Sequence, residues 1–421
     1  MKGNLEKEVG QRSKAISCLL PVFYSYLEKR ECALSGLDEG ELKEKLRELK
    51  KMSIENISEL KKKAIKNLTE NGIKVIEAKN PQQAQKAILK ILGGEKLLVK
   101  SKSNAFKELG LEKALGGVEV VETDLGDFLV QVAHLEGIHP VLPALKLTPK
   151  DISKAIKEKY GVSVKPEPAE IASFARNKLR EKIAEARVGL TGANAITADG
   201  SVMVLENEGN ISLVSRFPEK HIIVAGFEKI IPTVEDALLV AKCSAVYGTG
   251  QKFPVYVSLI SGPSKTADIQ NKVITGAQGA KEVYLILLDN GRSGILGTPY
   301  EEILYCINCG ACLNLCPIYH QIQNLFGNRY AGAKGVVFSK FSEGLQKSLE
   351  GGAFYCTGCS SCRHNCPAKI DLPELVRLVR GELVKKGLAP EGTKKTIENL
   401  QKYSSAIGKV GEDAGSDWQC C

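Results

Sequence analysis

Two hydrophobic periodicities divide the chain. Up to residue 71, apolar residues recur at helical spacing among alternating lysines and glutamates, and residues 38–71 predict one long helix or two shorter ones. After residue 72, short β-branched runs alternate with amphipathic segments, and strands are expected over 73–78, 96–100 and 118–123. This alternation predicts a parallel sheet whose strands are connected by crossover helices, an α/β fold.

The pattern continues beyond residue 124 and then changes near residue 298. The remaining expected elements of the α/β part are a strand over 139–144, helices over 148–160 and 171–186, and strands over 221–226, 255–260 and 282–289. The later residues form short helical segments around cysteine runs, and a last helix is expected over 396–408. We therefore divide the chain into a helical segment (1–71), an α/β domain (72–297), a cysteine module (298–388) and a tail (389–421).

The cysteine module holds two runs of the same spacing, C-x2-C-x2-C-x3-C-P. The first run contains Cys306, Cys309, Cys312 and Cys316, and the second contains Cys356, Cys359, Cys362 and Cys366. In bacterial ferredoxins this run supplies three ligands to one cluster, and its fourth cysteine binds the other cluster. We therefore predict two [4Fe–4S] clusters. The predicted ligand sets are a first quartet of Cys306, Cys309, Cys312 and Cys366 and a second quartet of Cys356, Cys359, Cys362 and Cys316.

Two other interpretations of the cysteines fit less well. Structural zinc sites usually pair two C-x2-C knuckles across a longer loop, which neither run resembles. A disulfide framework is disfavoured because these cysteines fall in one segment of a 421-residue chain without a recognisable secretory signal. Unpaired cysteines and oxygen-sensitive clusters indicate a reducing compartment, so we expect a cytoplasmic protein.

Charge and hydropathy exclude other classes of function. The net charge is +9, and lysines alternate with glutamates as on solvated helix faces. No basic patch interleaved with aromatic residues is present, so we expect no nucleic-acid partner. The most apolar early stretch, SCLLPVFYSYL, is too short to span a bilayer and contains Pro21, so we expect no transmembrane segment.

One loop of the α/β part resembles an anion site. Lys100, Ser101, Lys102 and Ser103 end a predicted strand and open a predicted helix, so they are candidates for binding the carboxylate or phosphate of a substrate. The alternative is ordinary capping of the helix by Ser103.

Later loops carry further candidates. Asn194 and Asn210 lie in glycine-containing turns and are candidate substrate-binding residues. Glu208 is a candidate base or nucleophile, or else a turn acid that accepts backbone hydrogen bonds. His221 is a candidate for proton transfer on pKa grounds, or else a structural residue at a strand end.

The loop GPSKTADI adds two candidates. Its Lys265 and Thr266 are candidate substrate-binding residues, with a turn and a helix cap as the alternative. The segment GTG at 248–250 lacks the rest of a dinucleotide-binding fingerprint. We therefore see no flavin or nicotinamide site in this chain.

Several segments resemble the lactate-utilisation (LUD) domain family, in the family's order. They include VKSKSNAFKELGLEKAL, VEVVETDLGDFLVQVA, VGLTGANAITADGSVMVLENEGN and GPSKTADI. With two cluster runs after that domain, the chain resembles the lactate-utilisation protein B family. The resemblance implies a LUD domain related to the sugar-phosphate isomerase and CoA-transferase fold, followed by an alpha-helical dicluster ferredoxin domain and a docking tail.

The resemblance also implies a function. It is that of an iron–sulfur electron-transfer subunit in a cytoplasmic L-lactate dehydrogenase complex that oxidises a small 2-hydroxy acid. Electrons would pass through two [4Fe–4S] clusters to or from a CCG-type or flavin partner. The implied partners are a cysteine-rich CCG-domain subunit and a second LUD protein or flavoprotein. The alternative is a LUD domain with its own small-acid or acyl-CoA transferase or isomerase-type activity, in which the clusters are structural or sensing.

Overall fold

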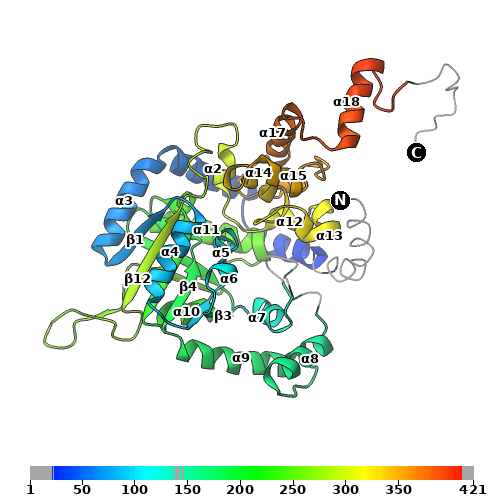
Figure 1. Ribbon diagram of the computed structural model, residues 1–421. Helices are drawn as coiled ribbons and strands as arrows, with labels where there is room; N and C mark the ends of the chain where they lie inside the picture. Colours follow the sequence, from blue (N-terminus) through cyan, green and yellow to red (C-terminus); the bar gives the residue numbers. More distant parts are fainter. Residues whose placement is uncertain (1–20, 22, 136, 138–142, 145–146, 410–421) are drawn as a thin grey trace.

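A six-stranded parallel sheet lies at the centre of the α/β part (Figure 1). The computed structural model describes the chain except for residues 1–20, 22, 136, 138–142, 145–146 and 410–421. The strands, in spatial order, are β1 (Ile73–Ala78), β12 (Glu282–Leu288), β7 (Lys220–Gly226), β4 (Val188–Gly192), β2 (Leu97–Lys100) and β3 (Glu119–Glu122). All neighbouring pairs are parallel, so all six carboxyl ends lie at one edge. The predicted parallel α/β fold is confirmed.

Alternation along each strand sends side chains to two separate cores. Ile222 and Val224 of β7 face a core that they share with α4 (Pro81–Leu92), α5 (Asn104–Leu109) and α6 (Leu111–Ala114). Ile223 and Ala225 face the opposite core, which contains α3 (Ile57–Glu70) and part of a second sheet. Both faces of β7 are therefore covered, as its nearly continuous apolar sequence predicts.

The second sheet is small and mostly antiparallel. Its strands, in spatial order, are β8 (Ile230–Ile231), β5 (Ala195–Thr197), β6 (Ser201–Glu206) and β9 (Tyr256–Ile260). The hairpin of β10 (Lys265–Thr266) and β11 (Ile274–Thr275) follows. Two helices complete this part, α10 (Asn210–Arg216) and α11 (Val234–Thr249).

Three helices form a further core with β2 and β3. They are α7 (Leu125–Val132), α8 (Pro149–Tyr160) and α9 (Pro168–Glu185). The strand predicted over 139–144 lies mostly outside the described residues, and its described members Pro143 and Ala144 form a turn.

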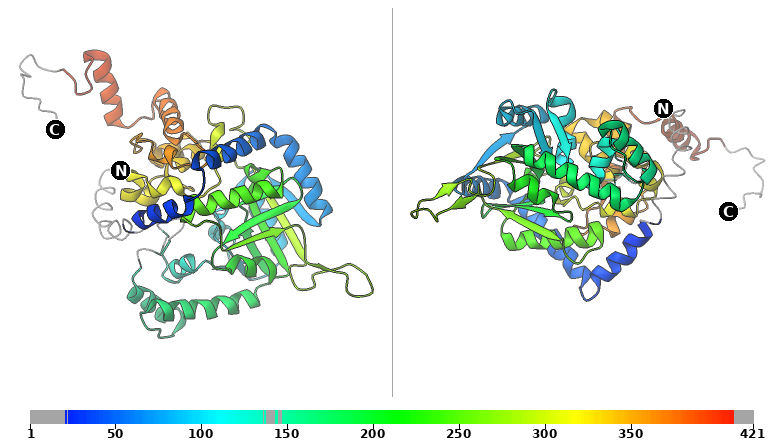
Figure 2. Two further views of the ribbon diagram at one scale, coloured as in Figure 1. Left: turned by 180° about the vertical axis from the view of Figure 1, so that it is seen from behind. Right: turned by 90° about the horizontal axis from the view of Figure 1, so that it is seen from below.

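The N-terminal helices connect the α/β part to the cysteine module (Figure 2). The region predicted as one or two helices is two, α2 (Glu39–Glu55) and α3, separated at Asn56. Arg47 of α2 donates hydrogen bonds to the backbone carbonyls of Ala368 and Lys369 at 3.0 and 2.8 Å. In the preceding helical stretch, the Phe23 ring stacks on His320 with 3.9 Å between centroids.

The cysteine module consists of short helices. They are η2 (Glu301–Tyr305), α12 (Ala311–Asn314), α13 (Pro317–Ile322), η3 (Gln323–Leu325), α14 (Gly332–Ser342), α15 (Leu345–Glu350), α16 (Ser361–His364) and α17 (Leu372–Lys385), and the tail adds α18 (Glu391–Tyr403). The last helix begins and ends earlier than predicted, because Ser404 adopts a left-handed conformation that ends it. It buries none of its residues and projects from the module (Figure 1). Within the described part of the chain, no helix has the length and apolarity to cross a membrane.

Candidate functional site

The two cysteine loops share one backbone conformation. In the first loop, Asn308 and Gly310 have positive φ values of 62° and 84°. At the same two positions of the second loop, Gly358 and Ser360 have φ values of 72° and 63°. Left-handed residues on both sides of the middle cysteine let each loop turn its first three thiols around one centre.

In the first quartet, the last cysteine of the second run lies beside the cysteines of the first run. Burial raises the pKa of the Cys309 thiol, and the nearby Cys366 and Cys306 thiols raise it further. Cys366 is itself buried, with Cys306 beside it. None of the cysteines that the structure describes forms a disulfide.

In the second quartet, the last cysteine of the first run lies beside the cysteines of the second run. Burial raises the pKa of the Cys362 thiol to about 12, and the thiols of Cys316, Cys356 and Cys359 contribute. These four cysteines line one small cavity, together with Cys312 of the first quartet. The chain thus groups its cysteines in the crossed sets on which the predicted ligation depends.

Local hydrogen bonds fit iron-bound sulfur. The backbone N–H groups of Asn308 and Tyr319 donate to the Sγ atoms of Cys306 and Cys316, each at 3.4 Å. Hydrogen bonds of this kind to cluster sulfurs help set reduction potential. Among the described residues, no three Cys, His, Asp or Glu side chains form a group that could hold a single metal ion. A cubane spreads its ligands over four irons, and each quartet supplies four thiols for it.

A larger cavity of about 260 Å³ lies where the parallel strands end at the cysteine module. Its walls include Ser101–Ser103 after β2, Gly192–Asn194 after β4, Gly226, Glu228 and Lys229 at the end of β7, Arg292 after β12, and Cys306, Cys309 and Cys312 of the first run. Ligands of open α/β sheets bind at the carboxyl ends of the strands. Here that position adjoins three members of the first quartet.

Comparison with known proteins places this arrangement in a family. The LUD domain family matches residues 61–288, and the 4Fe-4S dicluster domain family matches residues 302–370. A lactate utilization protein B of Macrococcus caseolyticus is 36% identical over 336 residues, which cover 78% of this chain and 69% of the relative. Another, from Anoxybacillus flavithermus, is 33% identical over 374 residues, which cover 86% and 77%.

This chain belongs to the lactate utilization protein B family. The family resemblance and the fold class expected from the sequence are confirmed. A crystal structure of a DUF162 family protein from Deinococcus radiodurans covers 55% of this chain and 98% of its own, with a TM-score of 0.31 and 13% identity.

In this family member, both lysines of the predicted anion loop have acidic partners. Lys100 is buried, paired with Glu122, and its Nζ lies 5.1 Å from the centroid of the Phe106 ring. The Nζ of Lys102 lies 3.5 Å from Asp124 and 3.4 Å from Asp127.

The two serines of the loop also line the cavity. The Ser103 Oγ accepts a hydrogen bond from the Ala105 N–H at 3.3 Å, so the capping interaction is present. The Ser101 N–H donates to the Leu190 carbonyl at 2.9 Å and thereby ties the loop to β4.

The candidate residues in the glycine-containing turns lie in two different places, one in the cavity wall and one outside it. Asn194 lines the cavity, where its Oδ1 accepts from the Leu205 N–H at 3.0 Å. Asn210 donates to the Thr123 hydroxyl at 3.1 Å, and the Glu208 carboxylate accepts from the Leu125 N–H at 3.0 Å. Neither Asn210 nor Glu208 is among the described residues that line the cavity.

Lys265 and Thr266 lie on the projecting β10–β11 hairpin (Figure 1). Lys265 donates to the Asn71 carbonyl at 3.1 Å, and the Thr266 hydroxyl donates to Asp268 at 2.9 Å. The first contact ties the hairpin to the end of α3, and the second lies within the hairpin. Neither residue is among the described residues that line the cavity.

His221 lies at the amino end of β7, whereas the cavity lies at the carboxyl end. Its Nε2 lies 2.7 Å from the Thr191 Oγ1, and its Nδ1 has no hydrogen-bond partner within the described structure. Burial lowers the pKa of His221 to about 3, so the ring is neutral at pH 7.

Neutral burial of His221 predicts a pH dependence of stability. Its pKa is about 6.5 in the unfolded chain and about 3 in the folded chain, so acidification below pH 6.5 protonates the unfolded chain first and favours unfolding. Between pH 7.5 and 5.5 we expect His221 to cost about 1.4 kcal/mol of stability. Denaturant unfolding of the wild type and of His221→Gln at both pH values measures this. An equal loss in both proteins would contradict the assignment.

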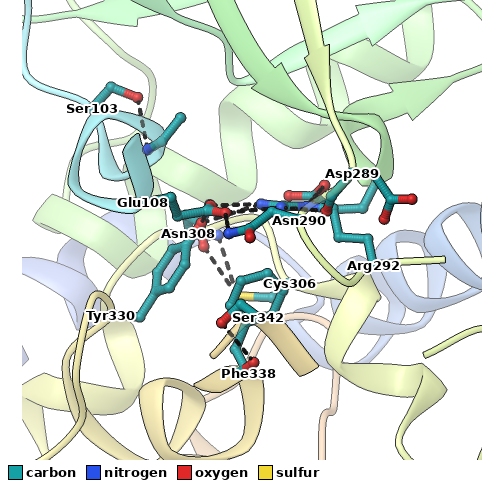
Figure 3. Close-up of polar contacts among 12 residues, drawn as sticks. Ser103, Glu108, Asp289, Asn290, Arg292, Cys306, Asn308, Tyr330, Phe338 and Ser342 are labelled. Carbon is teal, nitrogen blue, oxygen red and sulfur yellow. Dashed lines mark hydrogen bonds and ion pairs between the residues drawn. The ribbon is translucent and has the colours of Figure 1, made fainter. Parts of the chain in front are cut away.

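A buried ionic network that the sequence analysis did not identify borders the cavity (Figure 3). The Arg292 Nη2 lies 2.7 Å from the Glu108 carboxylate, and its Nε lies 2.5 Å from that of Glu228. The Tyr330 hydroxyl donates a further hydrogen bond to Glu108. Burial by itself would raise the pKa of Glu228, but the Arg292 charge holds it at about 2.

The sequence contains a pattern that could have identified part of the cavity wall. Glu228 and Lys229 follow the apolar run HIIVAG as Ser101 follows KLLVK, and polar residues after parallel strands tend to reach a binding crevice. Glu108 lies inside a helix, and no local pattern distinguishes it from a solvated glutamate.

Proposed function

We propose that this chain is the iron–sulfur electron-transfer subunit of an L-lactate oxidation complex. The relatives named lactate utilization protein B support lactate as the substrate. The observation that carries the proposal is the shared wall of the large cavity. Cys306, Cys309 and Cys312 face the same space as the loops at the ends of β2, β4 and β7, so a cluster held by these thiols would lie within that space and adjoin a small acid bound at the loops.

The two quartets support a route for electrons across the module. Cys312 lines both cavities, so the quartets adjoin each other. Cys359 of the second quartet is exposed, whereas Cys366 of the first is buried. The second quartet is therefore the one closer to an external partner. When bound, two [4Fe–4S] clusters supply one-electron transfer, and lactate oxidation to pyruvate releases two electrons and two protons.

A partner completes the proposed complex. We propose that a flavoprotein, a second LUD protein or a CCG-domain subunit takes part in the two-electron step or accepts the electrons, because hydroxy-acid oxidation commonly uses a flavin or nicotinamide. We place the complex in the cytoplasm, where thiols remain reduced.

The cavity gives no support to transferase chemistry. Among the described lining residues Glu228 is the sole carboxylate, and Arg292 holds it in an ion pair. Glu208, the candidate nucleophile, accepts a backbone hydrogen bond away from that wall.

Anaerobic reduction by lactate tests the proposed function. The reconstituted holoprotein, alone and coexpressed with candidate partner subunits, is mixed with L-lactate while its visible absorption and EPR spectrum are recorded. We expect lactate to bleach the absorption in a coexpressed mixture, and a mixture without this chain serves as the control. Failure of lactate to reduce the clusters in every mixture would overturn the proposal.

A further inference from the structure

Two lysines line the large cavity beside the first cysteine loop. Lys334 of α14 donates a hydrogen bond to the Asn308 side chain, and its Nζ lies 4.2 Å from the centroid of the Tyr330 ring. The backbone N–H of the same Asn308 donates to the Cys306 Sγ at 3.4 Å. Lys229 follows β7, is buried and lines the same cavity as Cys306. The two cations therefore approach one ligand of the first quartet from two different elements.

The charges of both lysines act on the Cys306 thiol. Burial by itself would raise the pKa of this thiol, but the Lys334 and Lys229 charges and the hydrogen bond from Asn308 hold it below its ordinary value. Burial raises the pKa of Cys309 and of Cys312 in the same quartet. The lysines thus stabilise negative charge on the sulfur nearest to them.

The carboxylates on this side of the cavity do not cancel the positive charge. Arg292 lies 2.7 Å from the carboxylate of Glu108 and 2.5 Å from that of Glu228. Burial lowers the pKa of Lys229, whereas the charge of Glu228 acts in the opposite direction. Against these two carboxylates stand three cations, Arg292, Lys229 and Lys334, so positive charge is in excess beside the first loop.

The second quartet has a different environment. Besides burial, the main influences on the pKa of Cys316 and Cys362 are backbone hydrogen bonds and the other thiols of that quartet. Arg380 of α17 donates to the backbone carbonyl of Cys356. The contrast marks the first quartet as the one whose sulfur lies among lysine charges.

Reduction adds a negative charge to an iron–sulfur cluster, and net charge, hydrogen bonds to sulfur and solvent exposure set its potential. Burial disfavours the added charge, whereas a nearby cation favours it, and solvent ions screen this attraction only weakly at a buried site. We propose that Lys229 and Lys334 raise the reduction potential of the cluster held by the first quartet. They offset the cost of burial, so that this cluster can accept electrons released in the cavity.

A mediated redox titration of the anaerobic holoprotein, followed by EPR, tests this role. In Lys334→Gln and in Lys229→Gln we expect reduction of the first cluster to become at least about tenfold less favourable, which is about 59 mV for one electron. Lys334→Gln keeps an amide that can donate to Asn308, so the substitution removes mainly the charge. Lys334→Arg keeps the charge and should keep a potential close to that of the wild type.

Two controls place the effect at the first cluster. Lys154→Gln removes a charge from an exposed lysine of α8 and should leave both potentials unchanged. In a Cys316→Ala background, which is predicted to keep only the first cluster, Lys334→Gln should still lower the remaining potential. The iron content of every variant is measured beside its potential.

Unchanged potentials in both glutamine variants at full iron content would overturn the inference, as would a shift confined to the second cluster. If Lys334→Gln alone loses iron, the potential of Lys229→Gln decides, and loss of iron from both would show a structural role instead. The inference rests on the proposed electron transfer and not on the substrate, because mediators reduce the clusters without lactate. Failure of lactate to reduce the clusters would therefore contradict the proposed function alone.

Discussion

Cys316→Ala is expected to remove the cluster of the second run and to leave the cluster of the first run. The expectation follows from the crossed quartets, in which Cys316 groups with Cys356, Cys359 and Cys362. Cys366→Ala should have the reverse effect, because Cys366 lies with Cys306 and Cys309. Each variant should retain about half of the iron.

Pairs of variants within one quartet provide the control for this prediction, because both members of a pair should lose the same cluster. After anaerobic reduction, Cys316→Ala and Cys359→Ala should show the same residual EPR spectrum, since both lose the second quartet. Cys366→Ala and Cys309→Ala should share the other spectrum. If the spectrum of Cys316→Ala instead matches that of Cys309→Ala, each run holds its own cluster and the crossed assignment is wrong.

Arg292→Met is expected to cause a large loss of stability. The substitution leaves Glu108 and Glu228 buried without their cation, and breaking a buried pair from one side costs on the order of 3–5 kcal/mol. The pKa of Glu228, held at about 2 beside Arg292, should rise in the variant. Thermal unfolding of the anaerobic holoprotein should show a midpoint lower by at least about 5 °C.

Two further proteins test the cause of that loss. Combining Arg292→Met with Glu108→Gln and Glu228→Gln removes the stranded charges and should recover much of the stability. Arg187→Met breaks only exposed pairs, at 3.8 Å, and should change stability by less than about 1 kcal/mol. A single variant Arg292→Met as stable as the wild type would show that the network does not stabilise the fold.

The sequence was most informative where one local rule determines the structure. Apolar runs such as HIIVAG gave the parallel strands because burial on both faces demands continuous apolar residues. The break at Asn56 was left open, because helical periodicity continues across it. The left-handed pairs Asn308–Gly358 and Gly310–Ser360, at equivalent positions of the two cysteine loops, show a match in backbone conformation that the cysteine spacing alone did not show.

The composition of the cavity wall was harder to predict. The loop Ser101–Ser103 could be identified because it follows a strand. The acidic partners of Lys102 could not be predicted, because they come from a different segment of the chain. Glu108 stands out only when its burial and its ion pair with Arg292 are known. Such features depend on which distant residues meet, and no alternation or spacing in a single sequence encodes them.

Pulsed EPR on the reduced holoprotein with bound ¹³C-labelled oxamate, a non-oxidisable analogue of the product pyruvate, tests the shared cavity most directly. In Cys316→Ala, which is predicted to keep the cluster bordering the cavity, we expect hyperfine coupling between ¹³C and that cluster. In Cys366→Ala, which keeps the other cluster, we expect a much weaker coupling or none. Coupling confined to Cys366→Ala, or absent from both proteins at saturating oxamate, would contradict the account.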